Sequence, residues 1–287
     1  MAKRIDIKTK GWSDYELIDS GENQKLEKFG GTLLYRPETE AVWEKKTPDV
    51  WKDAKAFFKW SAGKGSWVHK KEFGKSWQMK WNNISIILKL TAFKHLGIFP
   101  EQEANWVWLK ESVSKLKEPE ILNLFAYTGI SSLVMAEAGA KVTHVDASKQ
   151  SITWSEENRN ASKIDKNKIR YILDDALVFV KREVRRGKKY DGIVLDPPAF
   201  GRGAKGEVWK IEESLSPLMK SLKELLKDDK GSFFLLNGYS AGYSPESFKQ
   251  LVQSYFEAPQ MEYGEMHIEE KASGRVVPAG IYTRFRR

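Results

Sequence analysis

The sequence of 287 residues contains no cysteine. Disulfide bonds, thiolate zinc sites and iron–sulfur clusters are therefore excluded, together with any mechanism that needs a cysteine nucleophile. Histidine is also rare. Its four copies are scattered without the spacing of metal ligands, so we predict no metal site.

Long apolar runs are missing too. No stretch approaches the roughly eighteen residues that a membrane span needs. The basic start, MAKRIDIKTKGW, lacks the apolar core of a secretory leader. We therefore expect a cytoplasmic protein that does not bind a membrane.

Negative charge is the scarcer sign, because 48 lysines and arginines face 39 acids and leave a net charge of +9. A basic protein attracts polyanions by releasing their counterions, so nucleic acid is the favoured partner. A basic surface that serves only solubility is the alternative.

The composition and the hydrophobic pattern of the sequence change near residue 95. Seven of the eleven tryptophans precede that point, in short aromatic runs separated by turn formers such as Gly30-Gly31, which indicates antiparallel strands. Beyond it, apolar runs alternate with amphipathic segments, the pattern of βα units around a mostly parallel sheet. We predict a smaller, mainly β domain over residues 1–95 and a doubly wound, Rossmann-like α/β domain over residues 96–287.

The second part is predicted to hold five strands and four helices. Continuous apolar strands indicate burial on both faces, and ligands of such sheets bind at the carboxyl ends of the strands. The predicted strands are 121–125, 142–145, 169–173, 192–195 and 232–236, and the predicted helices are 130–139, 149–161, 175–186 and 212–227.

Turn-forming and acidic residues follow the first two strands. The run from Asn123 to Gly129 leads into a helix whose N-terminal N–H groups can face a ligand. Asp146 lies 17 residues after Gly129, where a carboxylate can accept both hydroxyls of a ribose. The alternative is that Asp146 or Ser148 merely caps the next helix.

The third and fourth strands also end in acids. Asp174-Asp175-Ala176 could hold an adenine amino group and ring nitrogen, or could cap a helix. The fourth strand ends in Asp196-Pro197-Pro198-Ala199-Phe200. Its two prolines fix an extended backbone, which directs the Asp196 carboxylate and the Pro197 carbonyl into a cleft.

In order and spacing, these four segments resemble those of the class I S-adenosylmethionine (SAM) dependent methyltransferases, in particular the large-subunit ribosomal RNA methyltransferases. The resemblance covers residues from about 90 onward. It implies a SAM cofactor, released as S-adenosylhomocysteine (SAH), and RNA methylation. It also implies cofactor contacts from Phe99, Gln102, Asn123, Phe125, Ala126, Tyr127, Thr128, Gly129, Asp146, Ala147, Ser148, Asp174, Asp175, Ala176 and Asp196. Asp196, Pro197, Pro198 and Phe200 would face the methyl group and the target.

Three positions depart from the family pattern. Asn123 stands where an acid is common, Ala199 where this branch often has lysine, and Glu103 where an arginine is frequent. These departures leave open a SAM-binding or RNA-binding module with weak or lost catalysis. A methyltransferase for a small molecule or a protein is a further alternative.

The missing cysteine bears on the acceptor atom. Several members of the family that this chain resembles methylate carbon 5 of cytosine through a cysteine nucleophile, which is lacking here. We therefore expect a base nitrogen as acceptor, with Asp196 and the Pro197 carbonyl accepting amine hydrogens. Phe200 either stacks on a flipped base or packs under its own loop.

One segment, Lys59–Trp81, interleaves six lysines with five aromatic side chains and a single glutamate. Such a segment can follow a phosphate backbone and stack on bases. The simpler interpretation is a small β domain with its tryptophans inward and its lysines outward.

Overall fold

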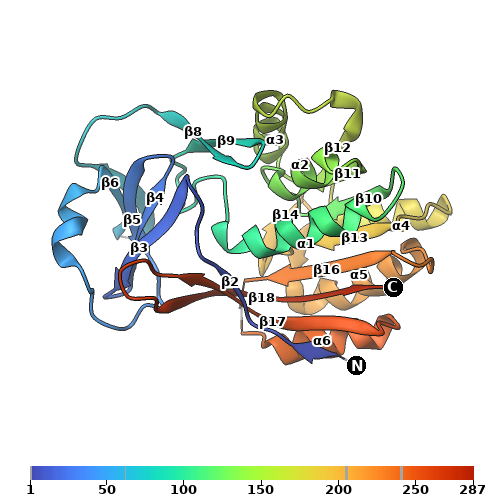
Figure 1. Cartoon of the computed structure of the whole chain (residues 1–287). Coiled ribbons are helices and arrows are strands. Elements are labelled where there is room, and N and C mark those ends of the chain that lie inside the picture. The colour runs from blue at the N-terminus through green and yellow to red at the C-terminus, as the bar shows by residue number, and fades with distance from the viewer. Residues whose placement is uncertain (1, 62, 204–205, 240–241) are drawn as a thin grey trace. The chain divides into compact units, whose positions relative to one another are not determined.

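The structure, a computed structural model, describes residues 2–61, 63–203, 206–239 and 242–287. The chain divides into two compact units (Figure 1). The large unit comprises residues 1–7, 104–266 and 279–287, and the small unit comprises residues 8–103 and 267–278.

This division differs from the predicted boundary at residue 95, because each unit is defined by contacts between segments that are distant in the sequence. β1 (Lys3–Arg4) pairs in parallel with β17 (Gln260–Glu269) of the large unit. In the small unit, Thr9 Oγ1 donates to the Pro100 carbonyl at 3.2 Å, so residues 96–103 remain there. Residues 267–278 also belong there, since Ser20 Oγ donates to Glu270 at 2.5 Å.

A mixed sheet forms the centre of the large unit. Its order is β1-β17-β18-β16-β13-β10-β11-β12, with β2 (Ile7–Thr9) also paired to β17. The chain winds from β10 outward to β12 and then returns to the other side of β10, which confirms the predicted doubly wound fold. Five neighbours run in parallel: β16 (Phe233–Gly238), β13 (Gly192–Leu195), β10 (Glu120–Leu124), β11 (Lys141–Asp146) and β12 (Ile169–Leu173). β18 (Val276–Arg286) is antiparallel to β16.

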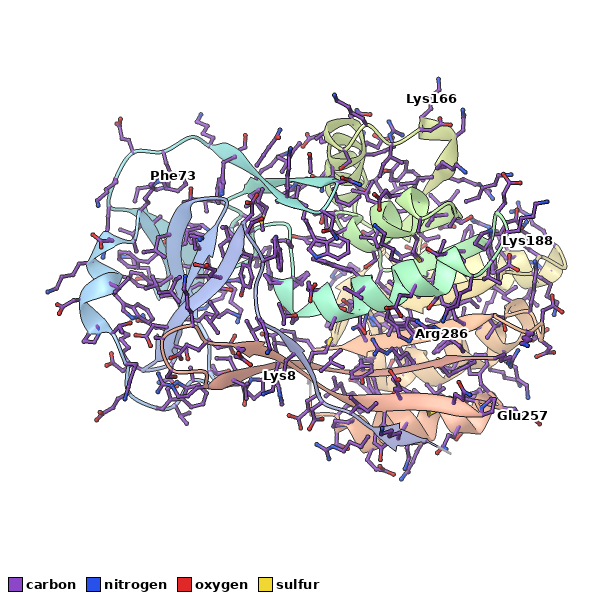
Figure 2. The ribbon with its side chains drawn as sticks, viewed as in Figure 1. Lys8, Phe73, Lys166, Lys188, Glu257 and Arg286 are labelled. Carbon is purple, nitrogen blue, oxygen red and sulfur yellow. The ribbon has the colours of Figure 1, made fainter. Side chains whose placement is uncertain are left out.

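Helices cover both faces of this sheet (Figure 1). One face packs through Leu124, Leu195 and Leu236 against α4 (Ala176–Arg185), α5 (Ile211–Leu225) and α6 (Pro245–Tyr255). The other face carries α1 (Glu103–Ser114), α2 (Ile130–Glu137) and α3 (Lys149–Ala161). Arg286 of β18 ties α1 to the sheet by donating to Ser112 Oγ at 2.7 Å (Figure 2). No helix in the described ranges is both long and apolar enough to cross a membrane.

Three short elements complete the large unit. β14 and β15 pair as an antiparallel hairpin directly after the Asp196 segment. The bounds are η3 (Lys166–Lys168), β14 (Phe200–Arg202) and β15 (Val208–Lys210).

The small unit is rich in strands, as its aromatic runs predict. Its main sheet has the order β3-β4-β5-β6-β7, and a separate hairpin is formed by β8 and β9. Neighbours pair antiparallel except β5 and β6, which are parallel. The bounds are β3 (Tyr15–Gly21), β4 (Gln24–Phe29), β5 (Thr32–Pro37), η1 (Pro48–Asp53), β6 (Ala56–Ser61), β7 (Lys64–His69), β8 (Ser76–Trp81), β9 (Ile84–Lys89) and η2 (Pro100–Gln102).

Candidate active site

The segments that stand out in the sequence lie at one edge of the large sheet. β13, β10, β11 and β12 are neighbours in that order and run in parallel, so their carboxyl ends meet at the same edge. The residues after them follow in the order 196–200, 125–129, 146–148 and 174–176. In a doubly wound sheet this edge is where ligands bind.

The first loop, residues 125–129, has an unusual backbone. Phe125, Tyr127 and Gly129 have positive φ angles of 54°, 49° and 83°. The Ala126 N–H donates to the Val145 carbonyl at 3.2 Å, and the Gly129 N–H donates to the Ala126 carbonyl at 3.0 Å. Residues with a side chain adopt this conformation rarely and at a cost, and such strain gathers where ligands are held.

Helix α3 packs against the first loop. A Cβ on Gly129 would collide with Ser155 Oγ, and it would lie 3.3 Å from His144 Cε1. Asn158 Nδ2 donates to the Thr128 carbonyl at 2.9 Å. Glycine is therefore required at position 129 by both its φ angle and the available space.

A buried network of three polar side chains also lies next to the first loop. Asn123 Nδ2 donates to Ser132 Oγ at 2.8 Å, and that oxygen lies 3.0 Å from His144 Nδ1. All three side chains are buried. Burial lowers the pKa of His144 to about 3, so its ring is neutral at physiological pH. Asn123, where the family often has an acid, therefore binds α2 through its amide nitrogen.

Asp146 links the first and second strand ends. Its Oδ2 accepts the Tyr127 N–H and its Oδ1 accepts the Ser148 N–H, each at 2.8 Å. Burial raises the pKa of Asp146 from its ordinary value, and the two N–H donors oppose that shift. The cap of α3 is Ser148, whose Oγ accepts the Ser151 N–H at 3.2 Å. Asp146 is therefore not the side-chain cap.

The third strand end is tied to α4. Asp175 Oδ1 accepts the Val178 N–H at 2.9 Å and so caps that helix. Asp174 pairs with Arg182 at 2.5 Å, and its N–H donates to the Asp146 carbonyl at 3.2 Å. Both acids are buried. Asp175 is therefore the N-cap of α4.

The fourth strand end is joined to the first by Trp209 of β15. Trp209 Nε1 donates to the Pro198 carbonyl at 2.7 Å, and its ring centroid lies 4.7 Å from that of Phe125. Phe200, by contrast, is 57% exposed. Its ring is therefore available to a ligand and does not pack under the loop.

Most of the chain also matches the model of a known protein family. The model of the family described as S-adenosylmethionine-dependent methyltransferase matches residues 59–279. The chain belongs to this family. SAM is therefore the cofactor of this methyltransferase, as the four strand-end segments predict.

Individual relatives agree with the family. The SAM-dependent methyltransferase from Agrobacterium tumefaciens has a solved structure with 38% identity and a TM-score of 0.93, covering 98% of this chain and 93% of that one. Ribosomal RNA large subunit methyltransferase K/L of Shewanella frigidimarina is 33% identical over 48% of this chain and 19% of that protein. The K/L enzyme of Pseudoalteromonas atlantica is 30% identical over 51% of this chain and 20% of that protein. The chain thus spans about a fifth of the length of these two curated relatives.

The residues that hold the strand-end loops in place, Trp209, Ser155 and Asn158, were not predicted from the sequence. Trp209 lies 11 residues after Pro198 in the sequence, so no local pattern connects the two. Ser155 and Asn158 did carry a signal, since Ser151, Trp154, Ser155 and Asn158 recur at helical spacing and are all buried in α3. Small polar side chains on a buried helix face indicate hydrogen bonds to the neighbouring backbone.

Phe99, Gln102 and Glu103 lie in the small unit. The Phe99 ring centroid lies 5.1 Å from that of His95, and Gln102 is buried. Glu103 Oε1 accepts the indole N–H of Trp81 at 3.4 Å. The contact of Phe99 and Gln102 with SAM stays a prediction.

Proposed function

We propose that this methyltransferase transfers the methyl group of SAM to a nitrogen of a base in ribosomal or other structured RNA. The observation that carries the proposal is the Trp209 junction, which fixes the Asp196–Phe200 segment beside the first loop. Methyl transfer is an in-line displacement, so it depends on donor and acceptor being held in alignment. A rigid junction between the two loops would supply that alignment.

The order of the loops supports one orientation of SAM along the sheet edge. The first loop would hold the methionine part, Asp146 with Ala147 and Ser148 the ribose, and the third strand end the adenine. Asp146 suits a ribose because each of its oxygens accepts one N–H and keeps a lone pair for a hydroxyl. Asp175 already caps α4, so we expect the N–H of Ala176, at the first position of that helix, to contact the adenine.

Asp196 would position the acceptor. SAM supplies the methyl group and departs as SAH when its carbon–sulfur bond breaks. The Asp196 carboxylate can accept a hydrogen bond from a base amine and take up the proton that the nitrogen loses as its lone pair bonds to carbon. Pro197 and Pro198 hold this carboxylate in place, and the exposed Phe200 ring would stack on the base.

Two observations support RNA as the substrate. The chain carries a net charge of +9, which favours a polyanionic partner. The curated relatives from Shewanella frigidimarina and Pseudoalteromonas atlantica are named as ribosomal RNA large subunit methyltransferases.

Incubation with methyl-labelled SAM tests the proposal. Ribosomal RNA, transfer RNA and total protein are offered separately, each taken from cells that lack the gene. We expect label in ribosomal RNA, recovered after digestion as an N-methylated nucleoside. Label only in protein, or in no pool although the enzyme binds SAM, contradicts the RNA substrate. Recovery of 5-methylcytidine contradicts nitrogen as the acceptor.

A further inference from the structure

Positive charge is concentrated in the second half of the small unit. Residues 54–81 contain seven lysines and one glutamate, a net charge of +6 out of +9 for the whole chain. About a tenth of the sequence therefore carries two thirds of the net charge.

The β6–β7 hairpin places four of the lysines on one face. Side chains alternate along a strand, and Phe57 pairs with Val68, Lys59 with Ser66 and Ser61 with Lys64. Continuing the alternation to the flanking positions adds Lys55 and Lys70 to the face that carries Lys59 and Lys64. We call Lys55, Lys59, Lys64 and Lys70 the lysine face.

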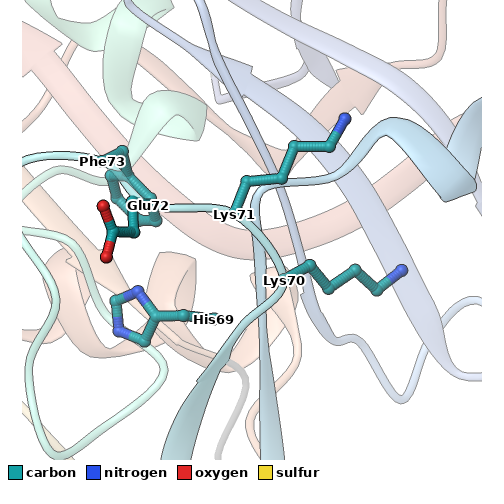
Figure 3. Close-up of a pocket in the computed structure, with 5 residues that line it drawn as sticks. All are labelled: His69, Lys70, Lys71, Glu72 and Phe73. Atoms are coloured by element: carbon teal, nitrogen blue, oxygen red, sulfur yellow. The ribbon is translucent and has the colours of Figure 1, made fainter.

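Nothing described in the structure neutralises the lysine face. No carboxylate in the described ranges lies within 4.0 Å of any of its four ammonium groups. The Lys70 and Lys71 N–H groups both donate to the Lys55 carbonyl, at 2.8 and 3.1 Å, which brings three lysines together. Figure 3 shows the Lys70 and Lys71 side chains extending away from Glu72, the acid of this segment.

Two stacked aromatic rings, those of Tyr35 and Phe57, lie beside the lysine face. The rings of Tyr35 and Phe57 stack in parallel, with centroids 4.8 Å apart and an angle of 3° between their planes. Lys70 Nζ lies 5.1 Å from the Tyr35 ring centroid and 5.7 Å from that of Phe57. These contacts hold the stem of Lys70 against the sheet and leave its charge at the surface.

Trp60 lies on the opposite face of the same hairpin and is 56% exposed. Its ring meets the buried Phe58 ring edge to face, with centroids 5.3 Å apart. Gly65 lies across from Trp60, and a Cβ there would collide with Phe58 and lie 3.1 Å from Trp60 Cζ3. The indole therefore packs on Phe58 beside Gly65, while more than half of the Trp60 surface remains in solvent. Burial of an apolar core does not require such a ring.

We propose that the β6–β7 hairpin is a docking surface for a single-stranded segment of RNA. The lysine face binds its phosphates, and the RNA passes over β7, the last strand of the sheet, so that one of its bases stacks on Trp60 on the opposite face. Lysines that follow a backbone, combined with an aromatic ring that accepts any base, are the means by which proteins bind single strands without sequence preference. This inference rests on the proposed RNA substrate, and it assigns binding to a surface other than the strand-end loops.

Binding of an oligouridylate of about 12 nucleotides to the whole enzyme tests the proposal. We expect Trp60→Ala to weaken binding by about tenfold, within the range measured for one stacked base. Trp60→Phe keeps a ring and should bind nearly as the wild type does. SAM affinity and thermal unfolding, measured on each variant, establish that it remains folded.

A matched pair of double variants separates local contacts from net charge. Lys59→Ala with Lys64→Ala removes two charges from the hairpin, whereas Lys220→Ala with Lys223→Ala removes two from α5. Only the hairpin pair should make the dependence of log Kd on log salt less steep, by about 1.4 for two lost phosphate contacts.

If the wild type binds no RNA, both the docking surface and the RNA substrate are wrong. If it binds RNA but Trp60→Ala and the hairpin pair bind equally well, the docking surface alone is wrong. If the hairpin variants lose binding only to vesicles of anionic phospholipid and not to oligouridylate, the partner is a membrane and the inference is overturned.

Discussion

Gly129 is the residue on which the shape of the first loop depends most directly. Gly129→Ala combines a positive φ of 83° with a collision against Ser155. Gly187→Ala is the matched control, because Gly187 also has a positive φ, 64°, but has no atom within 4 Å of its Cβ position. We expect the control to cost about 1 kcal/mol of unfolding free energy and Gly129→Ala about 2 kcal/mol more.

Denaturant unfolding measures the difference between the two alanine variants, and SAM titration measures its effect on the cofactor. Only Gly129→Ala should weaken SAM binding, because only it displaces the first loop from α3. Equal losses of stability in both variants would show that the contact with Ser155 does not matter.

His144 makes the stability of the large unit depend on pH. The unfolded histidine takes up a proton near pH 6.5, whereas burial keeps folded His144 neutral until about pH 3. Stability is therefore lost as the pH falls from 6.5 towards 3, by up to about 1.4 kcal/mol per pH unit. His144→Asn should remove that contribution. His95, whose pKa is lowered to about 4 by burial and by Arg36, should still contribute its own.

Urea unfolding between about pH 4 and 7 checks this expectation. The stability of the wild type should fall more steeply with decreasing pH than that of His144→Asn, by about one bound proton. Identical slopes would mean that His144 is protonated equally in the folded and unfolded states.

The sequence located acids at the strand ends but could not divide their roles. Asp146 and Ser148 are both residue types that cap helices, and only the structure shows that the Ser148 hydroxyl caps α3 while Asp146 binds the first loop. Capping depends on which side chain faces the first helical N–H groups, and spacing along the chain does not fix that direction.

At the scale of elements, the β14–β15 hairpin contacts the candidate active site through one indole, that of Trp209. Trp209→Phe keeps an aromatic ring beside Phe125 but removes the hydrogen bond to the Pro198 carbonyl. We expect a loss of about 1 kcal/mol in stability and a fall in the rate of methyl transfer, with SAM affinity little changed. Steady-state kinetics and SAM titration measure the two effects.

Trp108→Phe is the control for Trp209→Phe. Trp108 packs on Phe233 from α1, on the face of the sheet opposite to α5, so its replacement should alter stability without slowing transfer. A Trp209→Phe enzyme that transfers methyl groups at the wild-type rate would show that the junction does not align the loops.

The parallel strands were the predictable part of the fold. The strand predicted at 169–173 matches β12, and that predicted at 192–195 matches β13, because a strand buried on both faces is apolar throughout. β17 was not predicted. Its buried residues alternate with partly exposed ones, which is a weaker pattern than a continuous apolar run, and its pairing with β1 joins residues more than 250 positions apart.

At the scale of the whole molecule, the two units share their strands in a way that no local pattern reveals. Composition along the sequence distinguishes Trp-rich from apolar segments. Residues 267–278, however, belong to the small unit, whereas the residues before and after them belong to the large unit. Arg275 on this hairpin donates to Glu270 at 2.9 Å and to the Ser20 carbonyl at 3.2 Å. Contacts of this kind depend on tertiary structure, which explains why the boundary at residue 95 differs from the observed division.

The most direct test of the account is the rate of methyl transfer by Asp196→Ala at saturating SAM, with ribosomal RNA as acceptor. Asp196 is proposed to position the acceptor, so the variant should bind SAM as the wild type does and transfer methyl groups at least about 100-fold more slowly. Transfer by Asp196→Ala at the wild-type rate would contradict that role of Asp196. A wild-type protein that binds SAM but transfers no methyl group would contradict the proposal that the protein is a catalyst.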